Sequence, residues 1–197
     1  MEPDLFSNGL ENVLIEASNC DIRIMEDSIS FHKKPDKNDI SRIVKRLRDT
    51  VDTVDGIARK AAYGRTFRPG ILFGGTSTEY WICQQCFFVD VEHSYTVSQG
   101  IAICKRAGMV PNIIYSTFHY RPSDQRYCIV FVTPEPIFDV KLRDAIQDAL
   151  FHLFHSDPQT NSRERMFLGG RLVFWEDKTA RLDVQKLLRV EVNPYGV

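Results

Sequence analysis

The sequence predicts an α+β fold in which a mixed or antiparallel sheet is flanked by helices, with a helix-rich N-terminal portion. Aromatic and β-branched segments typical of strands alternate with segments whose apolar residues recur at helical spacing. The 197 residues can bury one sizeable core, and the hydrophobic (43%) and aromatic (11%) contents are those of a globular domain. Disordered and fibrous proteins are therefore excluded.

The N-terminal third is predicted to contain one long helix. From residue 40 to 61 apolar side chains recur every three or four positions, Asp39 can cap the start, and Gly64 ends the segment. Before it, the short apolar stretches 13–15 and 22–25 are expected to form a hairpin. Residues 65–79 are expected to be a loop, because glycines stand at 70, 74 and 75. No lysine follows them at P-loop spacing, which excludes a Walker motif.

The remaining chain alternates strands and helices. Strands are predicted within residues 80–94, 112–120, 126–132 and 166–175, and helices at 98–108 and 140–155. This order suits a palm-like (RRM-like) sheet covered by helices. We expect residues 1–68 to pack on a core of residues 69–197, together forming one compact domain. The tail VNPYGV carries no stop signal, which is compatible with a longer replication protein.

Charge is unevenly distributed although the net charge is only −1. Residues 1–30 contain seven acids and one base, whereas residues 39–68 contain eight bases and four acids. Such asymmetry is typical of a domain with one side that faces phosphates, although a solvated helix face would show it as well. The acidic N-terminus is unlike a secretory signal, and no apolar run could cross a membrane, so a cytoplasmic protein is expected.

Two carboxylates follow the apolar run 86–89. Asp90 and Glu92 stand two residues apart on a predicted strand, so their side chains point to the same face. Such a pair can hold Mg²⁺ or Mn²⁺ for phosphoryl or nucleotidyl transfer. An acidic strand end in solvent would show the same pattern. Further along, Thr117 and His119 share a face at another strand end, and Arg126 opens the next strand; all three can donate to a triphosphate.

The succession FFVDVEHS, IIYSTFHYRPSDQRYCIVFV and DPQTNSRERMFLGG resembles the archaeo-eukaryotic primase superfamily, in particular the primase-polymerases of plasmids, phages and integrated elements. The resemblance covers about residues 70–175. It implies a metal-dependent nucleotidyltransferase that performs template-directed primer synthesis or DNA polymerisation. The partners implied are nucleoside triphosphates, a single-stranded or primed DNA template and a replicative helicase.

The resemblance also implies roles for particular residues. Asp90 and Glu92 would be ligands of a two-metal Mg²⁺ or Mn²⁺ site, with Asp157 as the third acid. Asp139, Asp144 and Asp148 compete with Asp157 for that role. The nucleotide phosphates would be held by a second set of residues: Ser116, Thr117, His119 and Arg126.

Basic side chains are the candidates for contacts with template or primer phosphates. They are Arg42, Lys45, Arg46, Arg65, Arg68, Arg163 and Arg165, with Arg171 beside them. Tyr63, Phe67 and Tyr120 could stack on bases. Two other classes of function stay open: a non-catalytic module that binds DNA or a helicase through the basic helix, and a metal-dependent nuclease. The nuclease is disfavoured because no lysine follows Glu92.

The cysteines are predicted to be reduced core thiols. Cys83 and Cys86 form a C-x-x-C pair, but no second Cys/His pair follows at a zinc-site spacing, and residues three apart on a strand face opposite sides. A redox C-x-x-C pair normally opens a helix, whereas this one lies within a predicted strand.

Overall fold

The computed structural model describes residues 21–156 and 161–192, which form an α+β fold. The fold class predicted from the sequence is thereby confirmed. Among these residues every strand pair is antiparallel. The strands are β1 (Ile22–Ser30), β2 (Arg48–Asp52), β3 (Arg65–Arg68), β4 (Gly70–Leu72), β5 (Trp81–Val91), β6 (Ile113–Ser116), β7 (Tyr127–Ile137), β8 (Phe167–Leu168) and β9 (Val173–Glu176). The helices are α2 (Lys37–Arg46), α3 (Val54–Ala62), α4 (Val97–Arg106), α5 (Val140–Phe154) and α6 (Val184–Val192).

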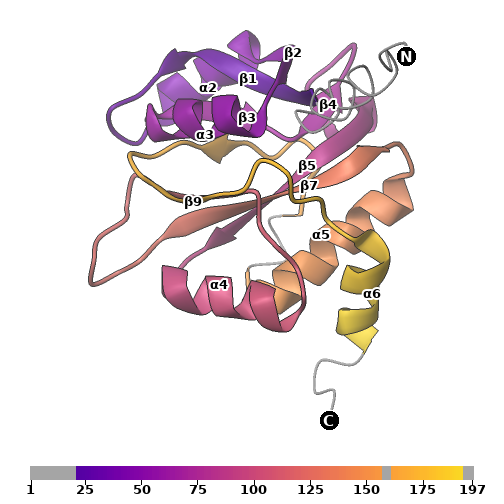
Figure 1. Cartoon of the computed structure of the whole chain (residues 1–197). Helices are drawn as coiled ribbons and strands as arrows, with labels where there is room; N and C mark the ends of the chain where they lie inside the picture. Colours follow the sequence, from indigo (N-terminus) through magenta and orange to yellow (C-terminus); the bar gives the residue numbers. More distant parts are fainter. Residues whose placement is uncertain (1–20, 157–160, 193–197) are drawn as a thin grey trace, which may run out of the picture.

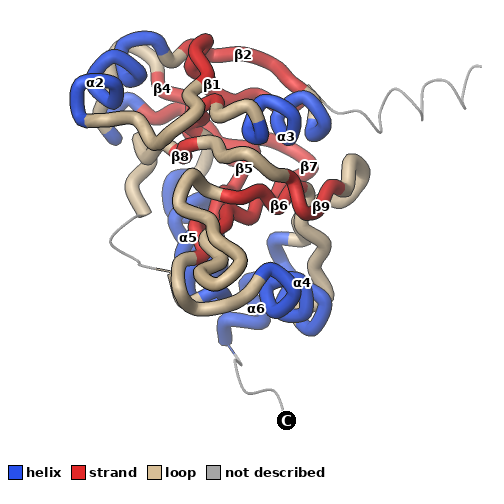
Figure 2. The backbone as a smooth tube through the Cα atoms, turned by 90° about the vertical axis from the view of Figure 1, so that its left-hand side faces the viewer, coloured by secondary structure: helices blue, strands red, loops and turns tan. Residues whose placement is uncertain are grey.

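The strands form two sheets. The first sheet has the order β2-β1-β3-β8, and the central sheet has the order β4-β5-β7-β6-β9. In Figure 1 the first sheet lies at the top with α2 and α3, the central sheet crosses the middle, and α4, α5 and α6 lie below it. Figure 2 shows the same layering from the side. The central sheet is therefore covered on both faces.

Alternation along β5 divides the core between these two faces. Phe87, Val89 and Val91 pack with the buried residues of α4, α5 and α6. Cys86 and Phe88 point the other way, into a cluster with the first sheet and α3. Cys83, Cys86, Cys104 and Cys128 are buried and free, which confirms the prediction of core thiols for these four; Cys20 lies outside the described residues.

The single helix predicted over residues 40–61 is wrong. The structure has α2 and α3 there, separated by β2, which pairs with β1 at the edge of the first sheet. Val51, which the helical pattern would bury, is 55% exposed on that edge. Thr53 accepts a hydrogen bond from the Gly56 N–H (3.0 Å) and begins α3. Asp36, rather than Asp39, caps α2, and the Asp39 side chain completes a capping box.

Two further expectations are corrected. Residues 65–79 are not all loop, because β3 and β4 lie within them and Phe67 is fully buried. Residues 166–175 form two strands in different sheets, β8 and β9, rather than one. Between them a Cβ on Gly170 would lie 1.6 Å from the Ser116 carbonyl oxygen, so only glycine fits there.

The hairpin predicted for residues 13–15 and 22–25 falls partly outside the described residues, since only its second stretch, in β1, is described. The division of the chain at residue 68 stays a prediction. Within the described residues no helix is both long and apolar enough to span a membrane.

Candidate active site at the ends of three strands

Three neighbouring strands of the central sheet, β5, β7 and β6, reach the same end of the sheet. In register, Asp90 of β5 lies opposite Cys128 of β7, and Cys128 lies opposite Tyr115 of β6. Cys128 and Tyr115 are fully buried on the face that the first sheet and α3 cover. Asp90 follows Phe88 on that same face, so its carboxyl stands where the core ends.

One residue beyond the ends of these strands stand Glu92, Arg126 and Thr117, each two residues away from a member of the inner row. The Thr117 N–H donates to the Arg126 carbonyl oxygen at 3.0 Å, so the pairing of β6 with β7 continues into this row. The structure thus brings four of the predicted site residues, Asp90, Glu92, Arg126 and Thr117, to the same end of the sheet.

The Asp90 carboxylate forms an ion pair with Arg165, whose Nη2 lies 2.7 Å from the Asp90 Oδ2. Both side chains are about a quarter exposed (27% and 28%). Partial burial raises the pKa of Asp90, the Arg165 guanidinium lowers it, and the nearby Glu92 charge raises it, with a net shift upward. Glu92 itself is exposed, one residue beyond the end of β5.

Arg126 is held in place by Asp124. The Arg126 Nε donates to the Asp124 Oδ2 at 2.9 Å, and the other carboxylate oxygen lies 3.0 Å from the Nδ1 of His93. His93 directly follows Glu92 and has a positive φ of 60°, which turns the chain sharply after the acid pair. Asp124 therefore links the loop after β5 to the start of β7. Sequence reasoning missed Asp124, although its position two residues before Arg126 was a usable signal.

Thr117 and His119 lie in a tight turn after β6. The Thr117 hydroxyl donates to the Arg126 carbonyl oxygen (3.3 Å) and accepts from the His119 N–H (3.3 Å). His119 is exposed, so its imidazole is accessible to a ligand. Ser116 differs: its buried hydroxyl accepts from the N–H groups of Arg171 and Leu172, each at 3.0 Å. Ser116 therefore holds residues 171–172, which lead into β9, against the end of β6. We leave it out of the proposed phosphate contacts.

The third acid predicted from the sequence, Asp157, lies outside the described residues. Its competitors have other partners: Asp139 caps α5 at Leu142, Asp144 pairs with Arg163 (2.6 Å), and Asp148 accepts from Asn161. Within residues 21–156 and 161–192, no three His, Cys, Asp or Glu side chains are grouped as a metal site would require.

The two carboxylates still fit a hard cation by the chemistry of their donors. Mg²⁺ is commonly bound by one or two carboxylates, with substrate phosphates and water completing its coordination. Asp90 and Glu92 supply such a pair at the mouth of the sheet. We therefore name these two residues as the ones that would hold the metal.

Most basic residues predicted to bind DNA have partners within the protein. Arg46 makes two hydrogen bonds to the buried Asp27, at 2.8 and 2.7 Å. Arg65 donates to the Asp27 carbonyl and to Ser30, and Arg68 is buried with its Nε on the Glu164 carbonyl. These contacts use the side chains to build the first sheet and its surroundings.

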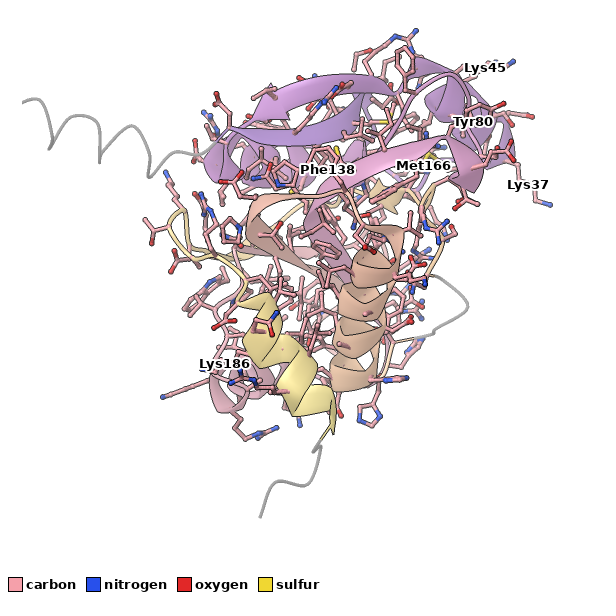
Figure 3. The ribbon with its side chains drawn as sticks, turned by 90° about the vertical axis from the view of Figure 1, so that its right-hand side faces the viewer. Lys37, Lys45, Tyr80, Phe138, Met166 and Lys186 are labelled. Atoms are coloured by element: carbon pink, nitrogen blue, oxygen red, sulfur yellow. The ribbon has the colours of Figure 1, made fainter. Side chains whose placement is uncertain are left out.

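Exposed bases remain on α2. Arg42 lies 3.9 Å from Asp39 with 72% of its side chain exposed, and Lys45 is exposed. Figure 3 shows Lys37 and Lys45 extending outward at the same end of the molecule. Of the predicted stacking residues, Tyr63 is 71% exposed, whereas the fully buried Phe67 cannot reach a base. Tyr120 packs against Phe174, with ring centroids 4.9 Å apart.

The comparisons with known proteins are sparse. No protein-family model matches the chain, and no curated protein matches it. Among solved structures, the chain is similar to the AEP domain of the cyanophage S-2L primase-polymerase (PrimPol), with a TM-score of 0.48 and 14% sequence identity. That similarity covers 95% of this chain and 97% of the other.

Proposed function

We propose that the protein is a metal-dependent nucleotidyltransferase that extends or starts a strand on a DNA template, as a primase-polymerase does. One observation supports the proposal: two carboxylates, an arginine and the Thr117 turn stand at the same end of three neighbouring strands. The sequence motifs that resemble the primase superfamily contain these same residues.

Each residue has a role in this proposal. Asp90 and Glu92 hold Mg²⁺ or Mn²⁺, which when bound neutralises the triphosphate and activates the attacking hydroxyl. Arg126, oriented by Asp124, donates to the phosphates as a planar fork. His119, presented by the Thr117 turn, donates to the same phosphates. The substrates are a nucleoside triphosphate and the 3′-hydroxyl of a primer or of a first nucleotide, and pyrophosphate leaves.

Nucleic acid would approach from outside this end of the sheet. The exposed Arg42 and Lys45 on α2 supply template contacts in the proposal, and a replicative helicase is a further proposed partner. Because most other bases of residues 39–68 have partners within the protein, the structure gives little support to the alternative of a non-catalytic module that binds DNA through one basic helix.

The test is extension of primed and unprimed templates with labelled nucleotides, in Mg²⁺ and in Mn²⁺. Asp90→Asn and Glu92→Gln should each abolish incorporation, because each removes a metal-binding charge while nearly conserving shape. Glu79→Gln, which changes an exposed carboxylate in the loop after β4, is the matched control and should retain activity.

Full template-directed synthesis by Asp90→Asn would refute the proposal. Shortening of the labelled strand in place of extension would favour the nuclease. DNA binding with a steep salt dependence, with neither metal dependence nor incorporation, would favour the non-catalytic module.

A further inference from the structure

Arg165 occupies the carboxylate on which the proposed metal site depends. Its Nη2 lies 2.7 Å from the Asp90 Oδ2, and its guanidinium lies over the Phe167 ring, 5.1 Å from the centroid. The sequence placed Arg165 among DNA-binding residues, but the structure points it at Asp90. Among the described residues, no basic side chain pairs with Glu92 in this way.

The backbone that carries Arg165 is fixed on several sides. Arg163 pairs with Asp144 at 2.6 Å, and the Glu164 carbonyl accepts from the buried Arg68 at 2.9 Å. A Cβ on Gly70 would lie 2.5 Å from the Arg163 carbonyl oxygen, so β4 also lies directly against this segment. These contacts fix the backbone around Arg165 and so position its side chain beside Asp90.

The contact between the two side chains is nevertheless incomplete. The Arg165 Nε is buried and has no hydrogen-bond partner, so part of the guanidinium is unsatisfied while it faces Asp90. The contact of the guanidinium with the Phe167 ring depends less on direction than a hydrogen bond does. Displacing the guanidinium from Asp90 therefore breaks one ion pair and leaves the backbone anchors intact.

We propose that Arg165 is the resident counter-ion of Asp90 and that a divalent cation binds only by displacing it. The inference rests on the proposed function, because it takes Asp90 and Glu92 as the metal ligands. With Arg165 in place the acid pair and its counter-ion carry one net negative charge, whereas without it they carry two. Arg165 is in this role a positioning residue that keeps the affinity for free metal low.

The test is titration of the purified protein with Mn²⁺, with free Mn²⁺ measured by electron paramagnetic resonance. Arg165→Gln should bind Mn²⁺ roughly tenfold more tightly than the wild type, since the competing ion pair is only partly exposed. Arg165→Lys, which keeps the charge, should stay close to the wild type. Thermal unfolding of each variant checks that the fold is retained.

Arg106→Gln is the matched control, because it removes the same charge from an exposed side chain in the last turn of α4, away from the segment that carries Arg165. Its Mn²⁺ affinity should stay within about twofold of the wild type. In the double variant Asp90→Asn/Arg165→Gln the tighter binding should disappear. Equal or weaker binding by Arg165→Gln, or equal tightening by Arg106→Gln, would overturn the inference.

The two proposals fail in distinguishable ways. If Asp90→Asn loses Mn²⁺ binding but Arg165→Gln leaves it unchanged, only the role of Arg165 is refuted. If Mn²⁺ binds the wild type and Asp90→Asn equally, the metal site itself is wrong, and with it both proposals.

Discussion

The N–H of Thr117 donates to the carbonyl oxygen of Arg126 at 3.0 Å, and this bond sets the two residues side by side, one residue beyond the ends of β6 and β7. The Thr117 hydroxyl adds a second bond to the same oxygen, at 3.3 Å. The pair aligns the turn that carries His119 with the arginine that Asp124 orients.

The contribution of Arg126 and that of Asp124, which orients it, can be separated by mutation. Arg126→Gln should lower kcat/KM for the nucleotide on the order of a hundredfold, because a fixed charge that faces the phosphates is lost. Asp124→Asn should lower it roughly tenfold, because the guanidinium remains but is less well oriented. Steady-state kinetics with the exposed Arg121→Gln as control would check this; an unchanged Arg126→Gln enzyme would exclude Arg126 from the site.

Ser116 is predicted to matter for stability and not for nucleotide binding. Ser116→Ala leaves two N–H groups of the chain leading to β9 without their acceptor, which should reduce the free energy of unfolding by roughly 1–3 kcal/mol. The KM for the nucleotide should not change. Urea unfolding would measure the stability, and steady-state kinetics would measure the KM. Ser41→Ala, at an exposed position on α2, is the control. A raised KM with unchanged stability would instead restore Ser116 to the phosphate contacts.

Asp144 should make stability depend on pH in acid. Burial raises the pKa of Asp144, but the hydrogen bonds and charges of Arg163 and Arg143 outweigh it, so the pKa lies below its ordinary value. The ionised carboxylate therefore stabilises the fold above the ordinary pKa of about 4, and this contribution is lost as pH falls through the lowered pKa.

Asp144→Asn tests this dependence. The substitution should lower the free energy of unfolding by about 1 kcal/mol at neutral pH, after allowance for solvent screening. This loss should become progressively smaller below about pH 4. Urea unfolding at several pH values would measure the difference between wild type and variant. A difference that stays constant between neutral pH and pH 3 would show that the charge of Asp144 is not its cause.

The sequence predicted the three inner strands of the central sheet, β5, β7 and β6, because they are largely buried. In β5 the apolar run 86–89 leads directly into Asp90, so the position of the carboxylates could be predicted. The first sheet was harder to predict. β2 is a short polar edge strand, and Val51 satisfied a helical pattern by coincidence, whereas the Thr53 cap was the signal that separates α2 from α3.

The site was predictable in part for the same reason. Asp90, Glu92, Thr117 and Arg126 could be found because each stands at the end of a buried strand or one residue beyond it. The Asp90–Arg165 pair could not, because it joins residues 75 positions apart through the fold. The structural role of Ser116 could not be predicted either, because it depends on Gly170, which lets a distant backbone segment approach β6.

The outer edge of β5 beyond Gln84 is closed by side chains instead of by a strand. The carbonyl oxygens of Cys86, Phe88 and Asp90 accept in turn from Gln84 (2.8 Å), Gln147 (2.9 Å) and Ser156 (2.7 Å). A second molecule cannot add a strand there, because the acceptors it would need are already occupied. The part of the sheet that carries the carboxylates is thus protected from edge-to-edge self-association, even though Glu92 at its end is exposed.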